Sequence, residues 1–139
     1  MRKILTIALV GMLAAAAPQT SSHAAQTFDG LWATSKKDCP EGDGPDSKTF
    51  IDFDNLRNGK PSPPLIDRYE NHCRVDRQTP AGDGLVLEAT CFEFWDDYTK
   101  GENGEKVTIK LSAGPKGTIR IDGRPYLLCK RKSELPKKQ

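Results

Sequence analysis

The feature that most constrains how this chain can fold is the strict alternation of apolar and polar residues in short segments. Apolar residues occupy every second position in residues 106–112 and again in residues 118–122. A period of two is typical of a β-strand with one buried face. Between alternating segments, Asp122-Gly123 predicts a tight hairpin that places Ile119 opposite Tyr126. The chain is therefore expected to fold mainly into antiparallel strands.

Turn signals divide the rest of the chain into further short strands. We expect strands at residues 28–34, 49–53, 65–77 and 85–95, with a loop over 36–46 and a Pro-containing connection over 55–64. The sum is an antiparallel meander of about seven or eight strands. Such a sheet hides its edges most simply by closing on itself. The predicted fold class is all-β, a small antiparallel barrel with two disulfides.

Residues 1–24 have the order of an export signal. Arg2 and Lys3 precede an uncharged run of fourteen residues, which is shorter than the roughly 20 residues that span a bilayer. Ser22 and Ala24 place small residues where a signal peptidase needs them, so we expect cleavage after Ala24, with cleavage after Ala25 as the second choice. The prediction is a signal peptide over 1–24 and a single domain over 25–139, in the periplasm or secreted.

Four cysteines lie in the predicted mature domain: Cys39, Cys73, Cys91 and Cys129. An even number in a small exported chain predicts two disulfides. We favour the sequential pairing, Cys39 with Cys73 and Cys91 with Cys129, because the first two flank a predicted strand pair and the others lie in later strands. The main alternative joins Cys73 to Cys91 across a hairpin. No C-x-x-C occurs and His72 is the single mature histidine, so no metal site is expected.

The charge of the predicted mature domain differs from that of the whole chain. Arg2 and Lys3 account for the formal charge of +2, so the remainder is neutral. Residues 26–101 carry a net charge of −6 and residues 102–139 one of +6. The basic C-terminal tail, about 130–139, is interpreted as solvated, with contact to an anionic surface as the alternative. Neutrality and the lack of interleaved basic and aromatic residues argue against nucleic-acid binding.

One short motif resembles a known family. Gly30-Leu31-Trp32 is similar to the G-x-W at the start of the first strand of calycin-type barrels, and the cysteine layout resembles small uncharacterised bacterial secreted proteins. In calycin-type barrels the tryptophan closes one end and a late basic residue packs on it. The resemblance implies that Trp32 closes the barrel, with Arg124 or Arg120 as its partner. An ordinary core aromatic is the other interpretation of Trp32.

Catalytic patterns are weak in this sequence, and no cofactor is expected. H-E-x-x-H, G-x-S-x-G and a phosphate loop are missing. Asp52 and Asp54 would share one face of a strand, where they could perform acid–base chemistry or simply keep that face hydrated and exposed to solvent. A loop could surround calcium, although it lacks the EF-hand spacing; its candidate ligands are Asp96, Asp97, Glu102, Asn103 and Glu105.

The strongest candidate for binding is the aromatic end of the longest predicted strand. Its members are Phe92, Phe94, Trp95 and Tyr98. Because both faces of that strand are partly apolar, either another segment covers the outer face or an aromatic patch is exposed to a partner. The first hypothesis is a non-enzymatic module that binds a periplasmic or extracellular protein, such as a hydrolase inhibitor. The alternatives are a carrier of a small apolar ligand and a hydrolase that uses acidic residues.

Overall fold

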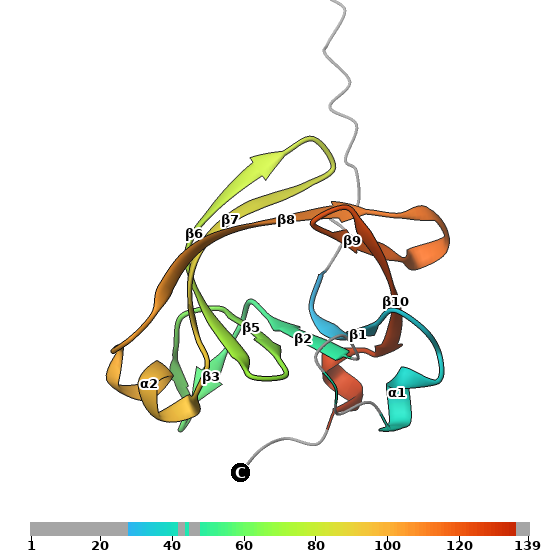
Figure 1. Cartoon of the computed structure of the whole chain (residues 1–139). Coiled ribbons are helices and arrows are strands. Elements are labelled where there is room, and N and C mark those ends of the chain that lie inside the picture. Colours follow the sequence, from blue (N-terminus) through green and yellow to red (C-terminus); the bar gives the residue numbers. More distant parts are fainter. Residues whose placement is uncertain (1–27, 42–43, 45–47, 136–139) are drawn as a thin grey trace, which may run out of the picture.

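A computed structural model describes residues 28–41, 44 and 48–135, so the predicted signal peptide and residues 136–139 lie outside the described residues. Eight strands form one closed antiparallel barrel in the order β1-β10-β9-β8-β7-β6-β5-β2, with β2 paired to β1 (Figure 1). The predicted all-β barrel is therefore confirmed. The strands are β1 (Gly30–Ala33), β2 (Lys48–Asp52), β5 (Leu65–Arg68), β6 (Asn71–Ala81), β7 (Gly84–Phe92), β8 (Glu105–Ala113), β9 (Ile119–Ile121) and β10 (Arg124–Lys130).

The remaining elements are short and lie outside this barrel. The Pro-containing connection forms a small separate hairpin from β3 (Leu56–Arg57) and β4 (Lys60–Pro61). The predicted loop over 36–46 contains α1 (Asp38–Glu41), and α2 (Trp95–Lys100) follows β7. Two single 3₁₀ turns are η1 (Pro115–Gly117) and η2 (Lys132–Glu134). None of the helices in the described part of the chain is both long and apolar enough to cross a membrane.

The hairpin predicted at Asp122-Gly123 is confirmed. Ile119 pairs with Tyr126, as the sequence predicts. Asp122 and Gly123 have φ angles of 51° and 82°. Positive φ at both central residues matches the twist of a two-residue antiparallel turn.

The prediction of one strand over residues 65–77 is wrong. The chain reverses at Tyr69 and Glu70, so that β5 and β6 pair with each other, with Arg68 opposite Asn71. Glu70 takes a φ of 47°, a conformation that a glutamate adopts less readily than Gly or Asn. The turn therefore carries no residue that would mark it in the sequence.

The interior of the barrel is filled by the inward faces of the strands. One contiguous cluster of buried side chains reaches from Phe28 and Trp32 through Ile51 and Ile66 to Tyr126. On β7 the inward residues are Leu87 and Ala89, and both are fully buried. The outward residues of the same strand include Phe92, which belongs to a second, smaller cluster.

The conformation of Gly30 explains the first position of the G-x-W motif. Its φ is +139°, and a Cβ atom there would lie 2.8 Å from the carbonyl oxygen of Lys130. The register between β1 and β10 shifts between Leu31 and Trp32, immediately after this close approach. Only glycine combines that backbone conformation with so short a distance between neighbouring strands.

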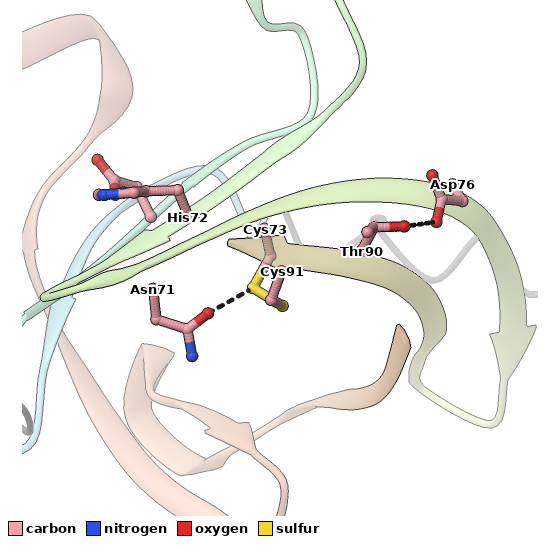
Figure 2. The surroundings of a disulfide bond; sticks show 7 residues. Asn71, His72, Cys73, Asp76, Thr90 and Cys91 are labelled. Carbon is pink, nitrogen blue, oxygen red and sulfur yellow. Dashed lines mark hydrogen bonds and ion pairs between the residues drawn. A yellow bond between two sulfur atoms is a disulfide. The ribbon is translucent and has the colours of Figure 1, made fainter. Parts of the chain in front are cut away.

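The favoured disulfide pairing is wrong, although two disulfides are present. The bonds join Cys39 to Cys129 and Cys73 to Cys91. Cys73 and Cys91 are directly opposite in the β6–β7 pair, so the alternative pairing across that hairpin is the correct one (Figure 2). Cys39 reaches Cys129 because β1 and β10 are neighbours in the closed barrel, which brings the two ends of the meander together.

Candidate functional site

A second apolar cluster lies on the outer face of the barrel, where α2 folds back over the wall. Phe92, at the end of β7, and Tyr98, on α2, are buried together with Leu65 of β5. The rings of Phe92 and Tyr98 meet edge to face with their centroids 5.6 Å apart. We call α2 with Phe94, Arg57, His72 and Arg74 the α2 corner. Figure 1 shows α2 beside β3 and outside the barrel.

Trp95 is held in place from two directions within the α2 corner. Its ring stacks on that of His72, with centroids 4.0 Å apart and an angle of 21° between the planes. The edge of Tyr98 approaches it at 5.1 Å. The Asp67 carboxylate accepts a hydrogen bond of 2.7 Å from Nδ1 of His72, which fixes the imidazole ring behind the indole. The Trp95 ring is thus held in one orientation by contacts on two sides.

Two arginines complete the α2 corner. The guanidinium of Arg57 lies 5.0 Å from the ring centroid of Tyr98 and 5.7 Å from that of Trp95, and Arg74 lies 5.6 Å from that of Phe92. Such contacts are typical of cation–π attraction. Burial raises the pKa of the Tyr98 hydroxyl above its usual value, although the positive charges of Arg57 and Arg74 act in the opposite direction. Tyr98 therefore stays neutral at physiological pH.

The four residues predicted to bind a partner divide into two pairs. Phe92 and Tyr98 are buried and support the corner from beneath. Phe94 and Trp95 are exposed by 56% and 39%. Leu56, exposed by 62%, precedes Arg57 on β3 and was not singled out from the sequence, because a lone leucine in a Pro-rich connection carries no periodic signal. The outer face of β7 near Phe92 is covered by Tyr98 of α2 and by the neighbouring Arg57.

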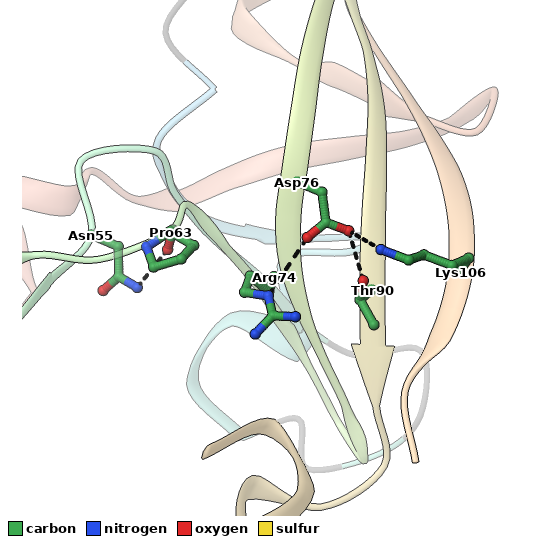
Figure 3. A network of polar contacts seen from close by, with 6 residues as sticks. All are labelled: Asn55, Pro63, Arg74, Asp76, Thr90 and Lys106. Atoms are coloured by element: carbon green, nitrogen blue, oxygen red, sulfur yellow. Dashed lines mark hydrogen bonds and ion pairs between the residues drawn. The ribbon is translucent and has the colours of Figure 1, made fainter. Parts of the chain in front are cut away.

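A polar network on the outer face stabilises the neighbouring strands. Asp76 accepts hydrogen bonds from Thr90 at 2.6 Å and from Lys106 at 2.8 Å, and its carboxylate lies 3.6 Å from Nε of Arg74 (Figure 3). Asp76 is the extra residue of a bulge, where the β6–β7 register shifts between Val75 and Arg77. Partial burial raises its pKa, but the two hydrogen bonds and the charges of Lys106 and Arg74 outweigh burial and lower the pKa overall.

The acid pair Asp52 and Asp54 does not form a symmetrical site. Strand β2 ends at Asp52, which is buried and paired with Lys132 of η2, whereas Asp54 lies in the exposed turn that follows. Asp29 is a third carboxylate of this region, and it accepts a hydrogen bond of 2.7 Å from the Phe53 amide. Burial raises the pKa of Asp29, helped by the charges of Asp52 and Asp54 and opposed by that hydrogen bond and by Lys132.

The acidic residues considered for calcium make other contacts. Asp97 accepts a hydrogen bond of 3.0 Å from Asn103, and Asp96 pairs with Lys100 at 3.2 Å. Glu102 donates its amide N–H to the Asp97 carbonyl, as part of the turn that ends α2. Within the part of the chain that the structure describes, no group of three or more His, Cys, Asp or Glu side chains is arranged to hold a metal ion.

Trp32 lies inside the barrel, with its indole N–H donating a hydrogen bond of 2.7 Å to the Phe28 carbonyl. It is opposite Leu128 on β10. Arg124 begins the same strand four residues earlier and is exposed, and Arg120 is exposed on β9, where it donates to the Gly123 carbonyl. Arg68, which the sequence did not single out, is in the same cross-strand row as Trp32, with Thr49 between them.

Comparison with known proteins does not assign the chain to a family. Neither a protein-family model nor a curated protein nor a solved structure matches this chain.

Proposed function

We propose that this protein is an exported, non-enzymatic binding module that recognises another protein through the α2 corner. The observation that carries the proposal is the exposure of Phe94 and Trp95 beside a pre-oriented arginine–aromatic cluster. Trp, Tyr and Arg dominate the energetic centres of protein interfaces, and large exposed apolar side chains that lie together mark such surfaces. Because Trp95 is already fixed by His72 and Tyr98, little side-chain entropy would be lost on binding.

Charge around the α2 corner defines the kind of partner. Glu93, Asp96 and Asp97 flank the two exposed aromatics in the sequence, and the Asp96 side chain is 86% exposed. Arg57, Arg74 and Lys100 lie in the same corner, so a partner with an apolar pocket and charges of both signs at its edge fits best, since complementary charge steers association. An inhibitor of an exported hydrolase is the form of module that we put forward first. Two disulfides and a closed barrel would present its binding surface rigidly.

Export also belongs to this proposal. Disulfides persist in oxidising compartments, so the two bonds are consistent with a periplasmic or extracellular protein. The signal-like residues 1–24 point in the same direction. We therefore place both the protein and its partner outside the cytoplasm.

The alternatives receive less support from the same observations. An apolar carrier needs internal space, whereas large buried side chains such as Trp32, Ile51 and Ile66 pack together within the barrel. A hydrolase built on Asp52 needs a carboxylate that is available to substrate, whereas Asp52 is buried against Lys132.

Site-specific photo-crosslinking tests the proposed surface. A benzophenone amino acid replaces Phe94 in one variant and Lys116, in the distant turn η1, in a matched control. We expect irradiation in the periplasm to link one defined protein to position 94 and none to position 116. Equal crosslinking from both positions would contradict the proposal.

Affinity measurements with the purified crosslinked partner then quantify the surface. Loss of a central aromatic anchor typically costs about 2 kcal/mol or more, so Phe94→Ala and Trp95→Ala should each raise the Kd at least about tenfold. Lys116→Ala should leave the Kd unchanged. Because Phe94 is exposed, Phe94→Ala should also leave the melting temperature within about 2 °C of that of the wild type. An unchanged Kd in both aromatic variants would refute the proposal.

A further inference from the structure

Three neighbouring inward-facing residues near one end of the barrel are polar, and they follow the buried Trp32 in the same cross-strand row. Thr49 pairs with Arg68, and Arg68 pairs with Asn71, across the adjacent strands β2, β5 and β6. Directly opposed residues in antiparallel strands place their side chains on the same face. Two residues further along each strand are Ile51, Ile66 and Cys73, which belong to the core. The hydroxyl, guanidinium and amide therefore lie side by side next to Trp32, at the end of the barrel where β2 and β6 begin and β5 ends.

The guanidinium of Arg68 is the unusual member of this row. Its Nε and Nη2 atoms are buried and have no hydrogen-bond partner among the residues that the structure describes. Buried donors are nearly always paired, because an unpaired one loses its hydration without compensation, and the loss is larger for a charged group. Arg68 as a whole is only partly buried, in agreement with its position as the last residue of β5.

The identity of the two unpaired atoms specifies the chemistry that would satisfy them. Nε and Nη2 are on the same edge of the guanidinium plane, and their N–H bonds point in parallel. A carboxylate accepts two such bonds side by side, in the bidentate geometry that makes arginine–carboxylate pairs strong. The row also supplies the Thr49 hydroxyl next to Arg68 on one side and the Asn71 amide on the other. The Asn71 amide oxygen contacts Cys73 Sγ at 3.1 Å, which directs this side chain toward the disulfide (Figure 2).

We propose that the Thr49–Arg68–Asn71 row is a binding site for a small carboxylate-bearing molecule, with the carboxylate on the Nε–Nη2 edge of Arg68. The single positive charge of this row matches a monoanion better than phosphate, which carries more than one negative charge near pH 7. The site is on the inner face of the barrel, whereas the α2 corner is on the outer face. It therefore does not rest on the proposed function, and either proposal can fail alone.

Nitrogen-15 NMR of the protein with both disulfides formed tests this site through the Arg68 Nε–H resonance. Benzoate is the probe, and neutral benzamide and inorganic phosphate are the comparisons. We expect benzoate to shift this resonance saturably, benzamide not to shift it, and phosphate to bind at least about tenfold more weakly. A shift that grows linearly with benzoate, an equal effect of benzamide, or phosphate binding as tight as benzoate would each overturn the proposal.

Substitution of Arg68 provides a second test of the proposed carboxylate site. Arg68→Lys keeps the charge but loses the two parallel donors, so its Kd for benzoate should rise by about tenfold or more. Arg77→Lys is the matched control, because Arg77 is an exposed arginine of β6 that pairs with Glu88 on the outer face. Equal affinities of Arg68→Lys and the wild type would overturn the proposal. If Arg68→Lys does not fold, the wild-type NMR titration decides alone.

Discussion

Ionised Asp29 destabilises the folded state at neutral pH, because its carboxylate is partly buried and lies near other acidic groups. Its pKa is raised in the folded protein, chiefly by burial, so the folded state favours the protonated form. Below about pH 3 the carboxyl group is protonated in both states and costs nothing. As the pH rises through 3.8, the value for an unperturbed group, the unfolded chain ionises first and gains stability. Above the folded-state pKa the full penalty remains.

Removing this charge should stabilise the barrel. Asp29→Asn keeps an oxygen that can accept the Phe53 amide hydrogen bond, while it eliminates the buried charge. We expect a higher free energy of unfolding at pH 7 and no difference from the wild type near pH 2.5, measured by urea denaturation across the pH range. Asp83→Asn, in an exposed turn, is the control and should show neither effect. A variant that is less stable at pH 7 would contradict this reasoning.

Single residues differ in how far the sequence reveals their roles. Gly30 and Trp32 stand out as a motif, and the structure gives the glycine a local reason, its positive φ and its closeness to Lys130. Arg68 carries no such mark. Its position in an inward row depends on the register of β2, β5 and β6, which the sequence did not predict because the turn at Tyr69 and Glu70 was not recognised.

At the scale of elements, β6 has an open edge that its own residues protect. Its partner β5 reaches only to Arg74, so residues 76–81 pair with β7 alone among the described strands. This part of the β6–β7 hairpin extends beyond the rest of the barrel (Figure 1). The bulge at Asp76, the charge of Arg77 and the missing N–H of Pro80 are all features that discourage pairing with another chain.

Pro80→Val should promote self-association of the protein through the free edge of β6. Valine restores a backbone donor and favours extended structure, so we expect dimers or larger species at concentrations several-fold lower than for the wild type. Light scattering coupled to size-exclusion chromatography measures the effect. Thr79→Val is the matched control, since it adds the same side chain on the same strand without restoring an N–H. Equal self-association of the two variants would show that apolar surface, and not the free edge, is responsible.

The sequence predicted strands better than it predicted the elements between them. Strands β8 and β9 follow from clean alternation, and their joining turns contain Gly or Asp-Gly. Helix α2 has six residues, too few to show a helical period, and its packing on Phe92 depends on a tertiary contact. The sequence thus indicated the aromatic residues of this region. The contacts of Arg57 and His72 and the burial of Phe92 and Tyr98 became apparent only from the structure.

At the scale of the whole molecule, the Cys39–Cys129 bond constrains the unfolded chain most. It encloses a sequence separation of 90 residues, against 18 for Cys73–Cys91. In the chain-entropy description a loop of that size contributes about 4–5 kcal/mol, and the shorter loop contributes about 3 kcal/mol. The sequential pairing failed because it took no account of barrel closure, which makes β1 and β10 neighbours and brings Cys39 close to Cys129.

The double variant Cys39→Ser/Cys129→Ser measures this contribution. Both cysteines are only partly buried, so the substitutions should disturb packing little and the loss should come from the freed unfolded chain. We expect a loss of about 4 kcal/mol in the free energy of unfolding from urea denaturation, with near-native circular dichroism in water. A loss below about 1 kcal/mol would mean that this bond barely restricts the unfolded ensemble.

The same bond has a consequence for an exported protein that meets proteases. Every loop between residues 39 and 129, including the projecting tip of the β6–β7 hairpin, lies inside one covalent ring. A single peptide-bond cleavage there opens the ring but releases no fragment, because the two pieces remain tied through Cys39 and Cys129. A chain that has been cut once in this region therefore remains one covalent molecule.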